Sequence, residues 1–235
     1  MDYFHAPPDK HRGSTIVIDG DEYSHLIHVM RKKVGDEIMT VDGCGNAYRV
    51  TISEIDHHTA VCAIAEHHPG LHEPSLTVTL GVGILKHTAA VDFLVEKTTE
   101  LGVSRIVPLQ TARTIPRHGR EERWQKIALS AMKQSGRCLL PYVTPLTSFS
   151  EFLQAIPRNA EKCIPHEKIL TPTLPEVMAA STAKEVVLAI GPEGGFTEEE
   201  IAAAVLAGFE VVSLGVRRLR TDTAAIAAVW AVAGR

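Results

Sequence analysis

The chain has 235 residues, of which 45% are hydrophobic and 22% are charged, and its formal net charge is −4. This length supports one large domain or two modest ones with substantial cores, and the acidic balance argues against attraction of nucleic acid to the whole surface. No apolar run is long enough to cross a membrane, and the first residues lack the basic-then-apolar pattern of a secretory signal.

The cysteines and histidines argue against two further classes of protein. Cys44, Cys62, Cys138 and Cys163 are scattered and form no Cys-x-x-Cys pair. This predicts free thiols in a reducing cytoplasm rather than a disulfide framework. The 12 histidines include no His-Glu-x-x-His motif and no zinc-binding spacing, so we expect no metal site.

Residues 1–72 carry short strand patterns separated by glycine turns. Strands are expected at Ser14–Ile18, Glu37–Asp42, Ala47–Ile55 and Thr59–Glu66, and a short helix at Glu22–Val34. The segment Gly43–Asn46 is typical of a hairpin turn. Short strands at this spacing favour a small β-barrel. The segment from His67 to Pro74 contains two prolines and a glycine and is expected to link this domain to the next.

From Ser75 onward the pattern alternates between strands and helices. Expected strands are Leu76–Val82, Val103–Leu109, Val186–Ile190 and Glu210–Leu214; expected helices are Ala89–Leu101, Glu121–Arg137, Phe149–Ala155 and Leu174–Ala180, with two more beginning near Thr197 and Thr221. Such alternation predicts a mostly parallel sheet covered by helices, so we assign residues 73–235 to an α/β domain.

The C-terminal part holds two strand-turn-helix units in tandem. In the first, the apolar run Val186–Ile190 leads into the glycine turn Gly191–Phe196. Thr197 and Glu200 then form a capping box, which starts a helix. The second unit repeats the order of strand, glycine turn and helix over residues 210–228.

These two turns predict a ligand site. Ligands of open α/β sheets bind beyond the carboxyl ends of the strands, so turns at adjacent strand ends are expected to line one crevice. Glycines let the backbone approach a ligand closely. Arg217, Arg218 and Arg220 lie at the second turn, where buried arginines are costly unless they meet anions. The alternative is that both turns are only tight connections.

Several enzyme classes are disfavoured by missing motifs. Gly81 and Gly83 follow a strand, but the third glycine of G-x-G-x-x-G and the Gly-Lys-Ser/Thr of a P-loop are absent. There is no G-x-S-x-G nucleophile elbow, and no cysteine lies in a nucleophile motif. Residues 86–137 hold 10 Lys and Arg against 5 Asp and Glu, which fits either a local phosphate-binding face or a solvated helix surface.

At the two glycine turns the sequence resembles a known family. The two segments are Ile190-Gly191-Pro192-Glu193-Gly194-Gly195-Phe196 and Leu214-Gly215-x-Arg217-x-Leu219-Arg220-Thr221-x-Thr223-Ala224. Three further stretches resemble the same family: Glu96–Val103, Gln134-Ser135-Gly136-Arg137 with Pro141, and His25–Arg31 with Gly35-Asp36. This set is similar to the RsmE family of SPOUT-class methyltransferases. These enzymes methylate N3 of a uridine in 16S rRNA of the small ribosomal subunit, using S-adenosylmethionine (SAM).

The resemblance implies a PUA-like β-barrel at the N-terminus and an α/β domain with a trefoil knot at the C-terminus. It also implies a homodimer whose active site is completed at the subunit interface. The cofactor is then expected to be bound by residues of three loops: His166, Glu167, Gly191, Pro192, Gly194, Gly195, Leu214, Gly215, Leu219, Thr221, Thr223 and Ala224.

Arg220 and Glu193 are the expected catalytic residues. Because a guanidinium stays charged, Arg220 could stabilise a deprotonated uracil. Glu193 is either a proton acceptor or a residue that holds its loop, and the second role is favoured because an ordinary carboxylate is a weak base. RNA contacts are expected from His25, Arg31, Lys32, Lys86, Lys97, Arg113, Gln134, Arg137 and Arg217, although for each alone a surface salt bridge is an equal alternative.

Three positions depart from the family pattern. Arg218 stands where an aliphatic residue is usual, Asp222 replaces a glutamate, and Asp2–His5 replaces an arginine-containing start. Two rival functions stay open. One is another SPOUT activity, such as methylation of a ribose 2′-oxygen, and the other is a PUA-type RNA-binding or ribosome-assembly factor without catalysis.

Overall fold

The computed structural model describes residues 2–234. Contacts within the chain divide it into two compact units. The first runs to Glu73 and also includes Met132–Leu140, and the second contains Pro74–Ala131 and the chain from Pro141 onward.

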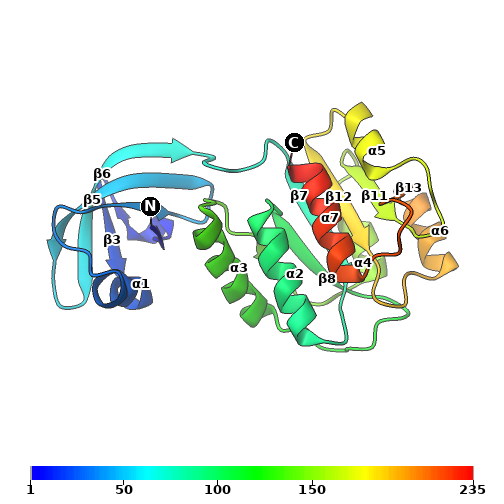
Figure 1. The fold of residues 1–235 in the computed structure, drawn as a ribbon, viewed down its shortest axis with the longest axis horizontal. Helices are drawn as coiled ribbons and strands as arrows, with labels where there is room; N and C mark the ends of the chain where they lie inside the picture. The colour runs from blue at the N-terminus through cyan, green and yellow to red at the C-terminus, as the bar shows by residue number, and fades with distance from the viewer. Residues whose placement is uncertain (1, 235) are drawn as a thin grey trace. The chain divides into compact units, whose positions relative to one another are not determined.

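The first unit is built on a curled six-stranded sheet with strand order β1-β4-β5-β6-β3-β2 (Figure 1). Its strands are β1 (Tyr3–His5), β2 (His11–Arg12), β3 (Thr15–Asp19), β4 (Glu37–Val41), β5 (Asn46–Ile55) and β6 (Thr59–Pro69). Alternate residues of the strands, among them Ile16, Ile18 and Ile52, are fully buried in one core. Among residues 2–234, no hydrogen-bonded pairing joins the edge strands β1 and β2. The expected barrel is therefore not closed and takes the form of a curled sheet.

The helix predicted at Glu22–Val34 is shorter than expected. It consists of α1 (Gly20–Ser24) followed by one π-helical turn, η2 (His25–Val29). The chain leaves the helix because Arg31 adopts a left-handed φ of 55° and Gly35 a φ of 93°. The expected linker is also partly wrong, since β6 continues to Pro69 and pairs with Asn46.

Residues 132–140 belong to the first unit by their contacts, although the sequence pattern places them in the second domain. Arg137, which is 2% exposed, forms an ion pair with Glu73 at 2.6 Å between Nη2 and Oε2. The same carboxylate accepts the N–H groups of Cys138 and Leu139 at 2.9 Å. Lys133 pairs with Glu22. These contacts tie the end of one long helix, α3 (Glu121–Ser135), to the curled sheet.

The second unit contains a parallel sheet of seven strands, in the order β10-β8-β7-β12-β11-β13, with β9 also paired to β8. The strands are β7 (Thr77–Gly83), β8 (Arg105–Gln110), β9 (Tyr142–Val143), β10 (Thr147–Ser148), β11 (Glu161–Pro165), β12 (Glu185–Ile190) and β13 (Glu210–Val212). The central strands β7 and β12 are almost wholly buried, as their continuous apolar sequences predict.

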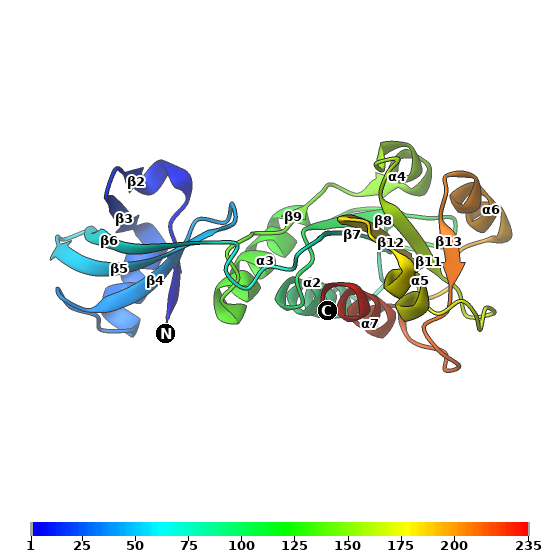
Figure 2. The ribbon, with the colours of Figure 1, turned by 90° about the horizontal axis from the view of Figure 1, so that it is seen from above.

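Helices cover both faces of this sheet (Figure 2). On one face lie α2 (Thr88–Glu100), α5 (Leu174–Ala180) and α7 (Thr221–Ala233); α4 (Phe149–Ala155) and α6 (Glu198–Leu206) lie on the other. Phe149 and Phe152 of α4 pack with Phe196 and Phe209 in the core beneath α4 and α6. The predicted mostly parallel, helix-covered sheet is confirmed. No described helix has the length and apolar character needed to span a membrane.

Candidate functional site

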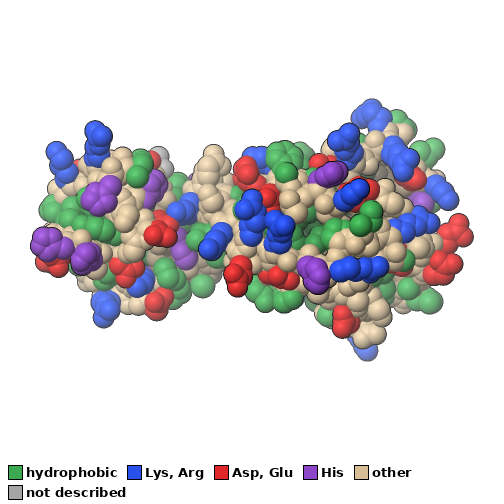
Figure 3. Space-filling model, turned by 90° about the horizontal axis from the view of Figure 1, so that it is seen from below, with side chains coloured by type: hydrophobic (Ala, Val, Ile, Leu, Met, Phe, Trp, Pro, Cys, Tyr) green, Lys and Arg blue, Asp and Glu red, His purple; other side chains and the backbone are tan. Residues whose placement is uncertain are grey.

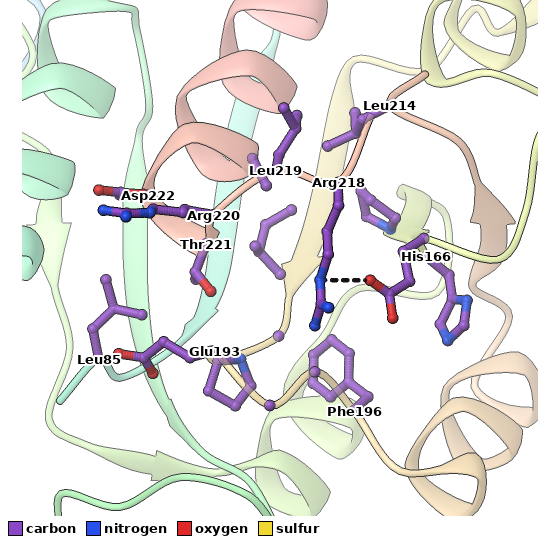
Figure 4. Close-up of a pocket in the computed structure, with 18 of the residues that line it drawn as sticks. Leu85, His166, Glu193, Phe196, Leu214, Arg218, Leu219, Arg220, Thr221 and Asp222 are labelled. Carbon is purple, nitrogen blue, oxygen red and sulfur yellow. Dashed lines mark ion pairs between the residues drawn. The ribbon is translucent and has the colours of Figure 1, made fainter. Parts of the chain in front are cut away.

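The two glycine turns line one cavity of about 720 Å³ (Figure 4). It lies beyond the carboxyl ends of β11, β12 and β13, and its walls come from three loops: 165–168, 190–196 and 214–220, with the start of α7. Leu85, His87 and Arg113, which follow β7 and β8, complete it. The prediction that both turns share one crevice is therefore confirmed, although their strands are not adjacent, because β11 lies between β12 and β13. The volume is typical of small-molecule sites.

Glycine is required in these turns by backbone shape and by crowding. Gly195 has a φ of +68° and Gly215 has a φ of +105°. Residues with a side chain rarely adopt these backbone conformations. A Cβ on Gly191 would lie 3.1 Å from both Cα of Gly195 and N of Phe196. A Cβ added to Gly83, at the end of β7, would lie 2.4 Å from N of Pro192. The turn is folded tightly on itself and on the neighbouring strand end.

Side chains from neighbouring strand ends hold the 190–196 loop in place. Arg113 Nη1 donates to the carbonyls of Gly194, at 2.7 Å, and Phe196, at 3.3 Å. Glu193 Oε1 accepts the backbone N–H of Lys86 at 3.0 Å. These Arg113 contacts were not predicted, and the sequence signal for them is an arginine placed just after β8.

The 214–220 loop leaves backbone donors available to a ligand. Gly215 N–H donates to Ser213 Oγ at 3.0 Å. From Val216 to Arg220 no backbone N–H has a hydrogen-bond partner within residues 2–234. The base of the loop is fixed, because Ser213 N–H donates to Pro172 O at 2.9 Å and Leu174 N–H donates to Ser213 O at 2.9 Å. A rigid base with free N–H groups above it suits recognition of a polar ligand.

Arg217, Arg218 and Arg220 of the second turn are exposed. The expectation that buried arginines at this turn would require bound anions therefore does not apply. Arg218 Nε lies 3.0 Å from Glu167 Oε2, and this ion pair joins two of the loops. Figure 4 shows that the guanidinium of Arg218 reaches toward Phe196, whereas Arg220 extends to the other side of the site, beside Asp222. Arg218 and Arg220 thus place their charges on opposite sides of the site.

Most of the residues predicted to bind the cofactor line this cavity. They are His166, Glu167, Gly191, Pro192, Gly194, Gly195, Leu214, Gly215, Leu219, Thr221 and Ala224. Thr223 does not, since it lies exposed on α7. The predicted catalytic pair, Arg220 and Glu193, lines it as well. Sequence reasoning missed Leu85 and His87, which follow β7, and Glu198, which starts α6.

The residues predicted to contact RNA are more dispersed. Arg113 and Arg217 line the cavity, and Lys86 is exposed beside it. Lys97 is held by Glu96 at 2.7 Å and Glu100 at 2.8 Å, which leaves it half-buried. Lys and Arg side chains are numerous on the face of the second unit shown in Figure 3.

Of the predicted RNA contacts in the first unit, one is wrong. His25 packs against Phe4, Lys32 pairs with Asp2 at 3.0 Å, and Arg31 and Gln134 are exposed. Arg137 is buried and bound to Glu73, so it serves the fold rather than an RNA surface.

Comparison with known proteins identifies the family. A family model described as an RNA methyltransferase domain matches residues 72–233, and one described as an RNA methyltransferase PUA domain matches residues 18–65. The chain is 34% identical over 223 residues to the ribosomal RNA small subunit methyltransferase E of Synechocystis, covering 92% of this chain and 72% of that protein. This chain belongs to the RsmE family.

Other RsmE family members support the assignment over nearly the full length. The Bacillus subtilis protein is 28% identical, with 93% of this chain and 89% of that protein covered. The crystal structure of the Neisseria gonorrhoeae enzyme bound to SAM superposes with a TM-score of 0.85 at 33% identity, covering 98% of this chain and 96% of that one. The RsmE architecture, a PUA-like domain followed by a parallel-sheet α/β domain, is thus present here.

Proposed function

We propose that this protein methylates N3 of a uridine in 16S rRNA of the small ribosomal subunit, with SAM as methyl donor. The observation that carries the proposal is the single cavity formed by both glycine turns, with Arg220 at its edge, in a chain of the RsmE family. As the substrate belongs to the ribosome, we place the activity in the cytoplasm.

The residues of the cavity fit SAM. Close packing at Gly191 and the positive φ of Gly195 both disfavour side chains, which leaves a bare backbone surface for a nucleoside. Leu214 and Leu219 supply an apolar wall for adenine, and the free N–H groups of the 216–220 segment supply polar contacts to its edge. His166, Thr221 and Ala224 would complete the pocket, while Thr223 is not among the residues that line the cavity.

Arg220 is the residue that we assign to transition-state stabilisation. When bound, SAM supplies the methyl group as a sulfonium electrophile, so the protein has to orient the uracil and stabilise the negative charge that remains after N3 loses its proton. Arg220 has no ion-pair partner among the described residues, and its charge is therefore available for the uracil oxygens.

Glu193 holds the loop in this proposal. Its carboxylate accepts the Lys86 N–H and so connects the 190–196 loop with the end of β7. We propose that it positions the loop, in agreement with the role favoured by the sequence. Arg113 has a similar task, because its guanidinium is engaged by the carbonyls of Gly194 and Phe196.

The other cations predicted to contact RNA, of which Lys32 and Lys97 are only partly exposed, are proposed to bind it. On the second unit these are Lys86, Lys97 and Arg217. On the first they are Arg31 and Lys32, together with the polar side chains of His25 and Gln134. Such contacts hold the phosphate backbone in register and carry little sequence information themselves.

We also propose that the chain is knotted at the cavity, as in the SPOUT class. β13 lies at the edge of the sheet beside β11, whereas α7 packs on β7 and β12 and against α5. The segment from β13 to α7 therefore passes the connection between β11 and β12, to which Ser213 is hydrogen-bonded. Such a path is rare in proteins, and no periodicity in a sequence predicts it.

A homodimer is proposed on the surface of helices α2 and α7. Phe93 of α2 is 48% exposed and Trp230 of α7 is 60% exposed, and these helices pack side by side. Large apolar side chains that stay exposed on adjacent helices are typical of an interface. Sedimentation of the wild-type protein and of Trp230→Glu should give a dimer and a monomer, respectively.

The test is methyl transfer to small-subunit rRNA, analysed as nucleosides. Purified protein is incubated with labelled SAM and either 16S rRNA or 30S subunits from a strain that lacks its own enzyme. Formation of 3-methyluridine supports the proposal. A ribose-methylated nucleoside would indicate a different SPOUT activity, and RNA binding without heat in a titration with S-adenosylhomocysteine (SAH) would indicate a non-catalytic factor.

A further inference from the structure

The ion pair between Arg218 and Glu167 spans two loops of the cavity. Glu167 follows β11 and Arg218 lies in the loop after β13. Both side chains line the cavity, and the dashed line in Figure 4 marks the ion pair that Arg218 forms. The side chains are 77% exposed for Arg218 and 52% exposed for Glu167, so the pair is open to solvent.

The guanidinium of Arg218 retains its hydrogen-bonding capacity. Within residues 2–234 it forms the ion pair but no hydrogen bond. A guanidinium has five N–H donors in a planar fork, which matches a carboxylate through two parallel bonds. Because exposed ion pairs are held weakly, one carboxylate can replace another at Arg218 at little cost.

The other arginines that line the cavity have different surroundings. Arg113 is engaged by two carbonyls, and Arg217 is proposed to bind RNA. Arg220 extends to the opposite side of the site, beside Asp222. SAM carries one anionic group, the carboxylate of its methionine moiety, and Arg220 is already assigned to the uracil. Arg218 is therefore the cation suited to this carboxylate.

We propose that Arg218 binds the carboxylate of the methionine moiety of SAM, and that Glu167 occupies this position until the cofactor enters. The proposal rests on the proposed function and adds a specificity-determining residue to the same cavity. In the bound state Glu167 is released and is free to accept a hydrogen bond from the ligand.

Calorimetric titration with two ligands tests the proposal. SAH contains the carboxylate, whereas 5′-methylthioadenosine contains the same nucleoside without the amino-acid part. Arg218→Leu should weaken SAH binding about tenfold, as expected for loss of a charge-assisted hydrogen bond, and should leave methylthioadenosine binding within about twofold. Glu167→Gln should strengthen SAH binding by up to about threefold, because the competing carboxylate is gone.

Lys168→Leu is the matched control, since Lys168 is a neighbouring exposed cation on the cavity wall with no assigned role. It should change neither affinity by more than about twofold. Equal weakening of both ligands in Arg218→Leu, no weakening at all, or the same selective loss in Lys168→Leu would each overturn the proposal. If the wild-type protein binds neither compound, the proposed function itself fails.

Discussion

Two glutamate–arginine pairs in this molecule have the same chemistry and opposite surroundings. In the first unit, Arg137 is 2% exposed, and its partner Glu73 also accepts two backbone N–H groups. In the second unit, Arg218 and Glu167 are open to solvent, and Arg218 forms no hydrogen bond within the described residues. Burial and the number of satisfied hydrogen bonds, rather than residue type, separate a pair that fixes the fold from one that can exchange its partner.

The largest expected effect is on the buried pair. Glu73→Ala removes the partner of a buried guanidinium and the acceptor of the Cys138 and Leu139 N–H groups, so the free energy of unfolding should fall by about 3–5 kcal/mol. Urea unfolding followed by circular dichroism measures it. Glu167→Ala, at the exposed pair, should change the free energy of unfolding by less than about 1 kcal/mol. Comparable losses in the free energy of unfolding for both variants would contradict the distinction between the buried and the exposed pair.

Arg220→Ala tests the functional side of the comparison. Because Arg220 has no structural partner, its loss should leave the fold and SAH affinity nearly intact. It should lower the single-turnover rate of methyl transfer by about 100- to 1,000-fold, the usual effect of removing a charge that stabilises a transition state. A rate near that of the wild-type protein would exclude Arg220 from the mechanism.

Arg113 is intermediate between the buried, bonded Arg137 and the exposed Arg220. It is exposed, and yet it donates to the carbonyls of Gly194 and Phe196. Arg113→Met should loosen the 190–196 loop and weaken SAH binding about tenfold, as expected for loss of charged hydrogen bonds. The exposed Arg117 on the same connection provides the control, and Arg117→Met should leave SAH affinity unchanged. Equal effects of the two variants would contradict the loop-holding role.

The smallest effect is a difference in thiol reactivity that reports on the buried pair. Burial raises the pKa of Cys138 to about 11, with Glu73 and Asp42 adding to the rise, whereas Cys44 is exposed. Near pH 8, Cys138 is therefore mostly protonated and should react with a thiol reagent much more slowly than Cys44. Glu73→Ala should accelerate the Cys138 reaction. Peptide mapping that shows equal rates for both cysteines in the wild-type protein would contradict this account.

Much of the second unit was predictable because local signals and tertiary packing agree there. Apolar runs mark β7, β8 and β12, and the capping box of Thr197 and Glu200 occurs as predicted, with Thr197 Oγ1 accepting the Glu200 N–H at 3.2 Å. The glycine turns could be placed at one cavity because parallel strands end at the same edge of a sheet.

The missed features depend on contacts distant in sequence. Arg137 lies in a basic segment and resembles a surface residue, but Glu73, 64 positions away, makes it a buried one. Leu85 and His87 reach the cavity from the segment after β7, and no local pattern marks them. The helix from residue 20 ends early because Arg31 takes a left-handed conformation, which no sequence rule requires of arginine.

The central claim is that the two glycine turns together form the SAM site. A crystal structure of the protein with SAH tests it most directly. The account predicts one nucleoside per chain in the cavity, with adenine between Gly191, Leu214 and Leu219. SAH bound elsewhere, or side chains filling this space in the crystal, would contradict it.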